Sequence, residues 1–156
     1  MSAYQKQKKS TDKWCSRYVR IRDSIACGGR GEWGRCYTCG KVVLIKRADS
    51  GHFKSRRSGG SSGIYFDERA IHLQCKHCNA FEQGSPTEYR EHLVSDQDHL
   101  HALDHNELTG EELIAELEFR HKVGSYNLMA LAGLELYFKN RVIAWCSEYN
   151  IVKWWK

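Results

Sequence analysis

Two Cys-x-x-Cys pairs constrain the fold of this chain more than any other feature. The first pair is Cys36 and Cys39, the second is Cys75 and Cys78, and 35 residues separate the pairs. This spacing is typical of a tetrahedral zinc site in which two distant segments each contribute two thiolates. Four sulfur ligands leave no open coordination position, so we expect a structural Zn²⁺.

The remaining cysteines and the overall composition indicate a reducing environment. The 156 residues suit one compact domain with an extension, and the seven cysteines are an odd number. The first ten residues are polar and basic, and no apolar run approaches the roughly 18 residues of a membrane span. We therefore expect a cytoplasmic protein that uses thiols for metal binding. We interpret Cys15, Cys27 and Cys146 as small buried or partly buried thiols, with Cys27 as a spare ligand the weaker alternative.

Charge is distributed unevenly along the chain. The formal net charge is +5, yet residues 1–57 hold 15 basic and 4 acidic side chains, whereas residues 58–156 hold 9 and 15. A basic segment of this density favours a polyanion, because each neutralised phosphate releases condensed counterions. A merely solvated basic face is the alternative. Beside a zinc site and a candidate catalytic histidine, nucleic acid is the better interpretation.

The N-terminal half is predicted to be an α+β core. Residues 1–11 are expected to form a flexible basic arm because they offer almost nothing to bury. From residue 12 a helix is predicted, on which apolar side chains recur at helical spacing: Trp14, Tyr18, Ile21 and Ile25. Basic side chains on another face of it are expected to contact DNA: Lys13, Arg17 and Arg20.

Beyond this helix we expect a glycine-rich loop, strands over 41–46 and 51–53, a basic loop over 54–63, and a helix that begins near Cys75 and reaches residue 83. Asn79 would then lie on that helix and face the preceding hairpin. The predicted zinc-bound core with its N-terminal helix spans residues 12–84.

Residues 85–156 are predicted to be a helical extension. The segments Ser85–Glu88 and Thr109–Glu112 both match the capping box, which predicts helices near 86–94 and 110–122. A long amphipathic stripe follows after Gly124, and we interpret it as either core or a dimer interface. Ten acidic side chains and one basic one lie between Glu88 and Glu118, so this region is not expected to contact DNA.

A constellation suited to phosphodiester hydrolysis lies between and just after the cysteine pairs. Such hydrolysis requires a general base, a divalent cation near the phosphate and cations that hold the strand. His52 suits the role of general base, because an imidazole has an unperturbed pKa of about 6.5. The amide oxygen of Asn79 is a hard ligand suited to Mg²⁺ or Mn²⁺. Three further cations close in sequence are expected to hold phosphate: Lys54, Arg56 and Arg57.

Six segments carry a resemblance to a known family: Tyr18–Asp23, Arg35–Gly40, Gly51–Phe53, Phe66–Arg69, His72–Asn79 and Glu88–Tyr89. Together they resemble the phage NinG/Rap recombination family, from about residue 18 to about residue 90. The resemblance implies a structure-specific endonuclease that cleaves Holliday junctions and D-loops, in the cytoplasm of a bacterial host. It also implies a zinc-stapled treble-clef core of the HNH-like, ββα-metal type.

Two wider resemblances suggest roles for single residues. The run Cys75–Asn79 is similar to the second zinc pair and adjoining metal ligand of phage endonuclease VII. The run Asp49–His52 resembles the Asp-Arg-Gly-His motif of non-specific ββα-metal nucleases. On that pattern His52 is the base, Asn79 is the ligand of Mg²⁺ or Mn²⁺, and Asp49 is a supporting acid or a second ligand.

The sequence also departs from these patterns at two positions. Gly51 stands where many HNH-like enzymes have a metal-binding aspartate, and Ala70 stands where the family usually has the asparagine of the HNH motif. His72 is expected either to orient the site or to satisfy backbone groups. We interpret His99, His101 and His105 as solvated side chains, with metal binding the alternative.

Two further functions stay open at this point. One is a zinc-stabilised accessory module that binds branched DNA without cutting it. The other is a less selective nuclease that also accepts RNA or linear DNA. A homodimer, paired through the C-terminal helix, is a further expectation, since a symmetric junction offers two equivalent strands.

Overall fold

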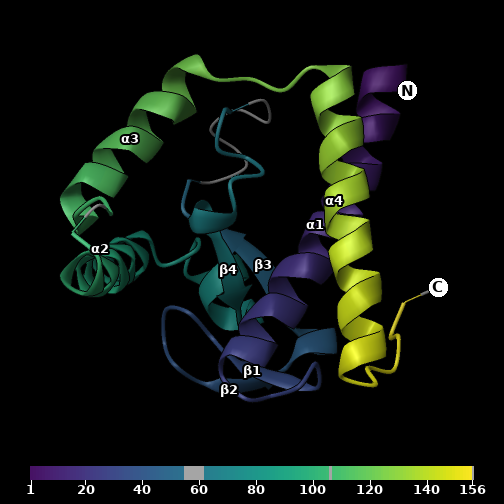
Figure 1. Cartoon of the computed structure of the whole chain (residues 1–156), viewed down its shortest axis with the longest axis horizontal. Coiled ribbons are helices and arrows are strands. Elements are labelled where there is room, and N and C mark those ends of the chain that lie inside the picture. The colour runs from purple at the N-terminus through teal and green to yellow at the C-terminus, as the bar shows by residue number, and fades with distance from the viewer. Residues whose placement is uncertain (55–61, 106, 156) are drawn as a thin grey trace.

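The computed structural model describes residues 1–54, 62–105 and 107–155, and it is a mixed α+β fold with small sheets. In Figure 1 two long helices lie side by side along one flank, two small hairpins occupy the middle, and two further helices lie on the opposite flank. The long helices are α1 (Ala3–Ala26) and α4 (Leu128–Glu148), and the opposite pair is α2 (Pro86–Leu103) and α3 (Gly110–Val123).

The first helix begins earlier than the sequence suggests. We expected a flexible arm over residues 1–11, but α1 already starts at Ala3, after a capping box between Ser2 and Gln5. Contacts with α4 explain this difference: Gln7 and Ser10 donate hydrogen bonds to Glu135, and the Thr11 hydroxyl donates to the Leu131 carbonyl. Tertiary packing therefore stabilises a segment whose own composition offers little to bury.

The apolar stripe of α4 packs inside this chain. Leu131, Phe138 and Val142 are fully buried and share a core with the apolar face of α1, including Val19 and Ile21. Of the two interpretations of this stripe, the core is therefore the one observed. A different face of α4 remains exposed, as described below.

Two antiparallel hairpins carry the cysteines and the candidate catalytic residues. Strand β1 (Trp33–Arg35) pairs with β2 (Val42–Leu44), and the first cysteine pair lies in the turn between them. The predicted strand over 41–46 is thus shorter, because Ile45–Arg47 forms the 3-10 helix η1. Strand β3 (Asp49–His52) pairs with β4 (Ile71–Gln74), so that His52 lies opposite Ile71.

The second cysteine pair surrounds the start of a short helical turn. After β4 comes η4 (His77–Phe81), a π-helical turn that contains Cys78 and Asn79. The prediction that Asn79 lies on a helix is confirmed, although the helix ends two residues before the expected residue 83. Before β4 the chain forms a further 3-10 helix, η3 (Glu68–Ala70).

Helices α2 and α3 enclose a second core beneath the β3–β4 connection. It contains Tyr89 and Leu93 from α2, Leu117 from α3, Phe53, which directly follows β3, and Ala70, the last residue of η3. The capping box at Thr109 and Glu112 is confirmed, and α3 ends within one residue of the prediction.

The predicted capping box at Ser85 is wrong. Ser85 has a left-handed backbone (φ 48°) and its side chain caps nothing, although Pro86 does occupy the first turn. The helix that follows also continues to Leu103 rather than residue 94. Two of its later side chains explain the extra length: Gln97 donates to the Leu108 carbonyl, and Asp98 accepts from the Gly110 amide.

Candidate functional site

The four paired cysteines come together in a geometry that suits zinc. The Sγ atoms of Cys36, Cys39, Cys75 and Cys78 all lie within 4.8 Å of one another, and those of Cys39 and Cys75 are 3.9 Å apart. A tetrahedral site with Zn–S bonds of about 2.3 Å places its sulfurs about 3.8 Å apart. The cluster therefore fits a four-thiolate zinc ion with no position for substrate.

The protein environment also favours the thiolate form of one ligand. Burial raises the pKa of Cys36, but hydrogen bonds from the Thr38 hydroxyl and from backbone amides outweigh it and lower the pKa to about 6. A thiol with such a pKa is largely deprotonated at neutral pH, which is the state that binds metal. The turn itself depends on Gly40, whose positive φ of 71° allows its amide to donate to the Cys36 carbonyl.

A cleft of about 650 Å³ lies beside the β3–β4 hairpin, bordered by α1 and η4. Three residues predicted to be catalytic, Asp49, His52 and Asn79, line it together with Arg20 from α1. The other lining residues are small or polar: Ser16, Ala48, Ser50, Ala80, Gln83 and Gly84. The structure thus brings Arg20 and Asn79, which lie 59 positions apart in sequence, into one cavity.

Asp49 holds Asn79 in a defined orientation. The amide nitrogen of Asn79 donates to Oδ2 of Asp49 over 3.0 Å, and Nζ of Lys76 donates to Oδ1 over 3.1 Å. Because its nitrogen faces the carboxylate, Asn79 has its Oδ1 atom to offer as a hard oxygen ligand. Both Asp49 oxygens already accept hydrogen bonds, which suits the supporting role better than the ligand role.

His52 is oriented by a backbone carbonyl. Its Nε2 lies 3.1 Å from the Tyr65 carbonyl oxygen, and the two rings are 4.9 Å apart between centroids. A carbonyl can only accept, so Nε2 carries the hydrogen in this contact. In the neutral ring the proton acceptor is therefore Nδ1, as a general base requires.

Tyr65 is in turn fixed by α1 and by the segment around it. Its hydroxyl donates to Asp12 over 2.9 Å, and the Lys8 ammonium lies 3.7 Å from its ring centroid. Sequence reasoning missed Tyr65 and Lys76, because the carbonyl of one and the ammonium of the other meet the site only through the tertiary fold.

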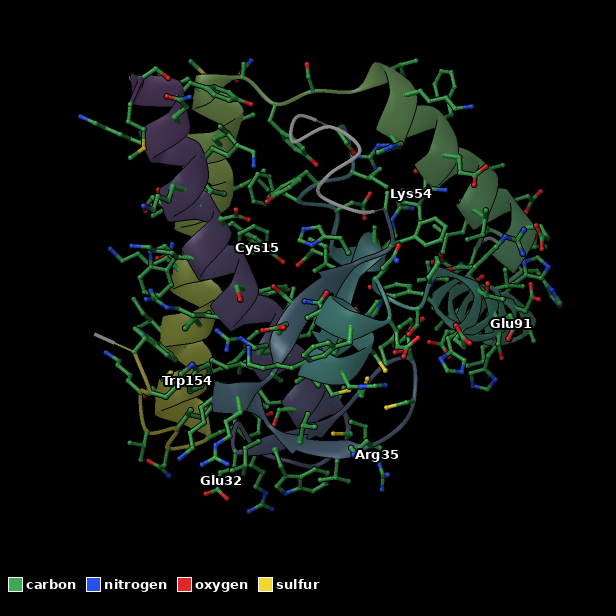
Figure 2. The ribbon with its side chains drawn as sticks, turned by 180° about the vertical axis from the view of Figure 1, so that it is seen from behind. Cys15, Glu32, Arg35, Lys54, Glu91 and Trp154 are labelled. Atoms are coloured by element: carbon green, nitrogen blue, oxygen red, sulfur yellow. The ribbon has the colours of Figure 1, made fainter. Side chains whose placement is uncertain are left out.

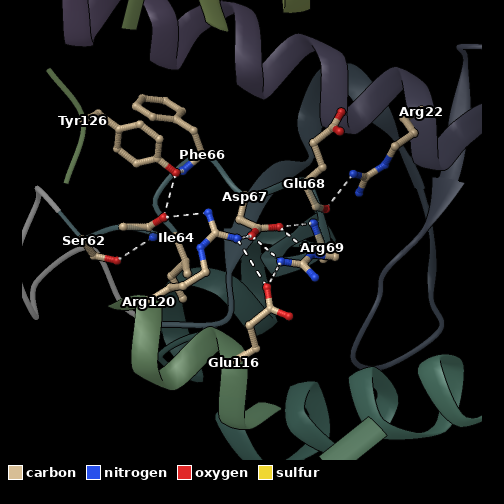
Figure 3. Close-up of polar contacts among 11 residues, drawn as sticks. Arg22, Ser62, Ile64, Phe66, Asp67, Glu68, Arg69, Glu116, Arg120 and Tyr126 are labelled. Carbon is tan, nitrogen blue, oxygen red and sulfur yellow. Dashed lines mark hydrogen bonds and ion pairs between the residues drawn. The ribbon is translucent and has the colours of Figure 1, made fainter. Parts of the chain in front are cut away.

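Helix α3 contacts residues 62–69 from the side opposite α1 (Figure 3). Asp67 is almost buried and accepts hydrogen bonds from Arg69 and Arg120, and Glu116 joins both guanidinium groups. The Tyr126 hydroxyl donates to the Gly63 carbonyl and accepts from the Phe66 amide. These contacts fix the chain on both sides of Tyr65, and so the carbonyl that His52 faces.

His72 takes part in a separate structural network. Its Nδ1 lies 3.5 Å from Asp23, and its ring stacks on Tyr37 with centroids 3.9 Å apart. Burial raises the pKa of Asp23, but the hydrogen bond with His72 and the charge of Arg22 outweigh it and lower the pKa to about 2. Asp23 also accepts the Leu73 amide, so this network ties α1 to β4. Arg22 also connects α1 to this region, because it donates to the Glu68 and Ile71 carbonyls.

The two departures from the family pattern have packing explanations. A Cβ on Gly51 would lie 1.8 Å from Oε1 of the buried Gln74, whose Nε2 donates to Thr38 and to the Gly84 carbonyl. Ala70 is buried in the apolar core formed with α2 and α3, where an asparagine would need its own partners.

The predicted DNA-binding cations differ in their surroundings. Lys13 is exposed, Arg17 and Arg20 are half-buried on α1, and Arg20 also donates to the Ile45 and Ala48 carbonyls. Lys54 forms an ion pair with Glu118 over 3.0 Å, so α3 already neutralises it. Arg56 and Arg57 lie outside the described residues.

Among the described residues, the other histidines and cysteines join no second metal-type cluster. His99 and His101 lie on α2 rather than in a loop, and the Cys36 cluster is the one metal-type group found within 1–54, 62–105 and 107–155. Among those residues no helix is at once long and apolar enough to cross a bilayer.

Fold and site together define a small α+β protein with a four-cysteine cluster that could hold zinc, beside a polar cleft. Comparison with known proteins gives its family. The family model described as "Bacteriophage Lambda NinG protein" matches residues 2–130, and the chain therefore belongs to the NinG family of phage proteins.

Curated relatives agree with this assignment. The chain is 30% identical over 86 residues to the ninG protein of Escherichia phage lambda and, equally, to that of Escherichia phage 933W; the match covers 55% of this chain and 35% of each relative. It is 36% identical over 59 residues to the ninG protein of Salmonella phage P22, which covers 38% of this chain and 28% of that one. The chain thus matches about a third of the length of these relatives. No solved structure matches it.

Proposed function

We propose that this protein is a metal-dependent endonuclease that cleaves branched DNA formed during recombination, such as Holliday junctions and D-loops. One observation carries the proposal: His52, Asn79 and Asp49 line a single cleft next to the four-cysteine site. The family resemblance supports the substrate class, and the basic face of α1 supports a polyanion.

The order of elements supports an HNH-like core of the treble-clef, ββα-metal type. A cysteine turn between β1 and β2 is followed by the β3–β4 hairpin and then by η4 with the second cysteine pair. The hairpin presents His52 and η4 presents Asn79. In this arrangement a structural zinc ion would join the first cysteine turn to η4, which lines the cleft with Asn79 and Ala80.

In the proposed reaction His52 is the general base. Its Nε2–H is held by the Tyr65 carbonyl, so Nδ1 accepts a proton from the attacking water. Asn79 Oδ1 would hold Mg²⁺ or Mn²⁺, with Asp49 keeping the amide in place. When bound, the divalent ion would stabilise negative charge on the phosphate and on the leaving oxygen. Arg20, which lines the same cleft, supplies positive charge for the scissile strand.

The test is a cleavage assay on labelled substrates. A four-way junction, a D-loop, a flap and a linear duplex would be incubated with the parent protein in Mg²⁺ and then in Mn²⁺. His52→Ala and Asn79→Ala are expected to abolish cutting while zinc content and DNA binding stay at parental values. His99→Ala, an exposed histidine on α2, is the matched control and is expected to cut normally. Equal cutting of all four substrates would instead indicate a less selective nuclease.

One observation favours a second candidate, the non-catalytic accessory module that binds branched DNA. Lys76 and Asn79 already occupy both Asp49 oxygens, which leaves few acidic ligands for a divalent cation. A parent protein that binds junctions but cuts none of the substrates in either metal would establish that alternative.

The proposal includes a homodimer. The outward face of α4 carries Met129, Leu136 and Ile143 at seven-residue spacing, with exposed fractions of 83%, 59% and 46%. Such spacing repeats on one face of a helix, as in a coiled-coil seam. A second copy of α4 would cover this stripe.

A further inference from the structure

A row of indole and guanidinium groups runs along α1 and the C-terminal segment. We call it the Trp–Arg row, and it consists of Trp14, Arg17, Arg20, Trp154 and Trp155. The Arg17 guanidinium lies 4.4 Å from the Trp14 ring centre and 4.9 Å from that of Trp155. The Arg20 guanidinium lies 5.3 Å from the Trp154 ring centre, and the two C-terminal indoles meet edge to face at 4.5 Å.

The end of α4 sets the direction of the C-terminal segment. Asn150 has a left-handed backbone (φ 53°), which ends the helix and reverses the chain. Ile151 then packs over Gly31, where an added Cβ would lie 2.5 Å from the isoleucine side chain. Residues 151–155 are irregular, and Figure 2 shows Trp154 beside the end of α4.

The row is continuous with the cleft. Arg20 belongs to both, because it lines the cavity with His52 and Asn79 while it covers one side of Trp154. Two exposed cations extend the row: Lys13 precedes Arg17 by one helical turn, and Lys139 on α4 lies 5.8 Å from the Trp14 ring centre. A path of alternating rings and positive charges therefore leads into the proposed active site.

Rings that alternate with cations are the composition of surfaces that hold unpaired nucleic acid. Bases stack on aromatic side chains whatever their identity, and neighbouring arginines neutralise the phosphates between them. A surface for paired DNA needs cations alone, because its bases are already stacked. Packing at the seam between α1 and α4 accounts for the apolar part of these indoles, which are half-buried and contact the main core. It does not account for the interleaved arginines or for their continuity with the cleft.

We propose that the Trp–Arg row binds an unpaired strand of DNA, with a base stacked at Trp154 and phosphates held by Arg17 and Lys13. The consequence for cleavage rests on the proposed function: a strand that leaves the row enters the cleft at Arg20. The favoured substrates are then branches that carry an unpaired segment, such as D-loops, forks and flaps, ahead of a fully paired four-way junction.

Binding measured without cutting tests the inference separately from nuclease activity. Fluorescence anisotropy would be recorded for labelled oligo(dT) and for a linear duplex of equal length, without added divalent cation. Trp154→Ala is expected to weaken oligo(dT) binding by about tenfold, in the range of one lost base stack, and duplex binding by less than twofold. Trp154→Phe, which keeps a ring, is expected to stay within about threefold of the parent.

Matched controls separate stacking from damage to the fold. Phe119→Ala removes an exposed aromatic ring from α3 and is expected to change neither affinity. Thermal unfolding of Trp154→Ala shows whether the C-terminal segment still packs. Parental oligo(dT) affinity in Trp154→Ala would overturn the inference, and so would equal losses on oligo(dT) and duplex. Tighter binding of oligo(rU) than of oligo(dT) would also overturn it, by assigning the row to RNA. Loss of cutting alone, with these affinities unchanged, would bear only on the proposed function.

Discussion

At the scale of single residues, the cleft depends on groups that hold its candidate catalytic side chains in place. Asp49 orients Asn79, and the Tyr65 carbonyl orients His52. Residues of this kind act through a neighbour, so their loss should reduce activity without changing the fold.

Asp49→Ala tests this view directly. Without the carboxylate the Asn79 amide can rotate, and we expect cleavage to fall by roughly 10- to 100-fold, as for other residues that support a metal ligand. Cleavage rates over a series of Mg²⁺ concentrations measure the effect, and a higher Mg²⁺ requirement is expected. Glu91→Gln, an exposed carboxylate on α2, serves as the control. Parental rates in Asp49→Ala would rule out the supporting role.

Gly51 allows a second test at this scale. The family resemblance suggests that Gly51→Asp would restore a missing metal ligand, but Gln74 occupies the space that the new side chain needs. We expect Gly51→Asp to lower the free energy of unfolding by about 1–3 kcal/mol, as overpacking does, with no gain in cleavage. Urea unfolding and the cleavage assay together decide between the two outcomes.

Asp23 predicts a pH dependence of stability. Its pKa is lowered to about 2 in the folded protein from an ordinary value of 3.8. A carboxyl group with a depressed folded pKa stabilises above its unfolded pKa, and that stability is lost as the pH falls through the folded value. The shift corresponds to about 2 kcal/mol. Urea unfolding of the parent and of Asp23→Asn should show a gap between their free energies of unfolding. This gap should be full above pH 5 and narrow toward pH 2. A gap independent of pH would contradict this assignment.

At the scale of elements, α3 acts as a brace for the chain around Tyr65. Asp67, Arg69, Arg120 and Glu116 join it to that segment. Arg120→Ala would leave Arg69 as the partner of the nearly buried Asp67 and remove the hydrogen bonds of Arg120 to Asp67 and to the Gly63 carbonyl, at a loss of roughly 1–3 kcal/mol. Hydrogen exchange should show faster exchange at Phe66 and Asp67, whose amides bond to Tyr126 and to the Ile64 carbonyl. Unchanged exchange there would show that α3 is not needed as a brace.

The elements also show which features the sequence could predict. Local signals were enough for α3, for the helical position of Asn79 and for the four-cysteine cluster, because capping boxes and Cys-x-x-Cys spacing act over a few residues. The start of α1 and the end of α2 were missed because hydrogen bonds to acceptors outside each helix, such as Glu135 and the Leu108 carbonyl, determine them. In the cleft, His52 and Asn79 were predicted by motif. The Tyr65 carbonyl and Lys76 were not, since no local pattern marks a backbone acceptor or an exposed lysine.

At the scale of the whole molecule, zinc should decide whether the hairpins stay together. Structural zinc sites contribute free energy comparable to the total stability of a small domain. We expect one zinc per chain, and we expect its removal by a chelator to unfold the hairpins and abolish cleavage. The helical circular dichroism signal of α1 and α4 should largely persist, because their shared core contains none of the four cysteines. Cys78→Ser should reproduce the loss, and an unchanged thermal midpoint in fully zinc-free protein would contradict a structural role.

The assembly state can be tested on the outward face of α4. Leu136→Glu places a charge in the exposed stripe without touching the buried one, so the fold should be kept while a dimer dissociates. Light scattering coupled to size exclusion measures the mass of both proteins. Arg141→Glu, which reverses an exposed charge on the same helix about 140° around its axis from Leu136, is the control. A monomeric parent would exclude this mode of pairing.

The position of α4 has a practical consequence for anyone who trims this protein. The family match ends at residue 130, just two residues after α4 begins at Leu128, yet Phe138 and Val142 lie at the centre of the main core. A fragment cut at the family boundary would leave the apolar face of α1 uncovered, and such a surface promotes aggregation. The smallest piece expected to give a well-behaved sample therefore extends at least through Ile151, well past the end of the family match.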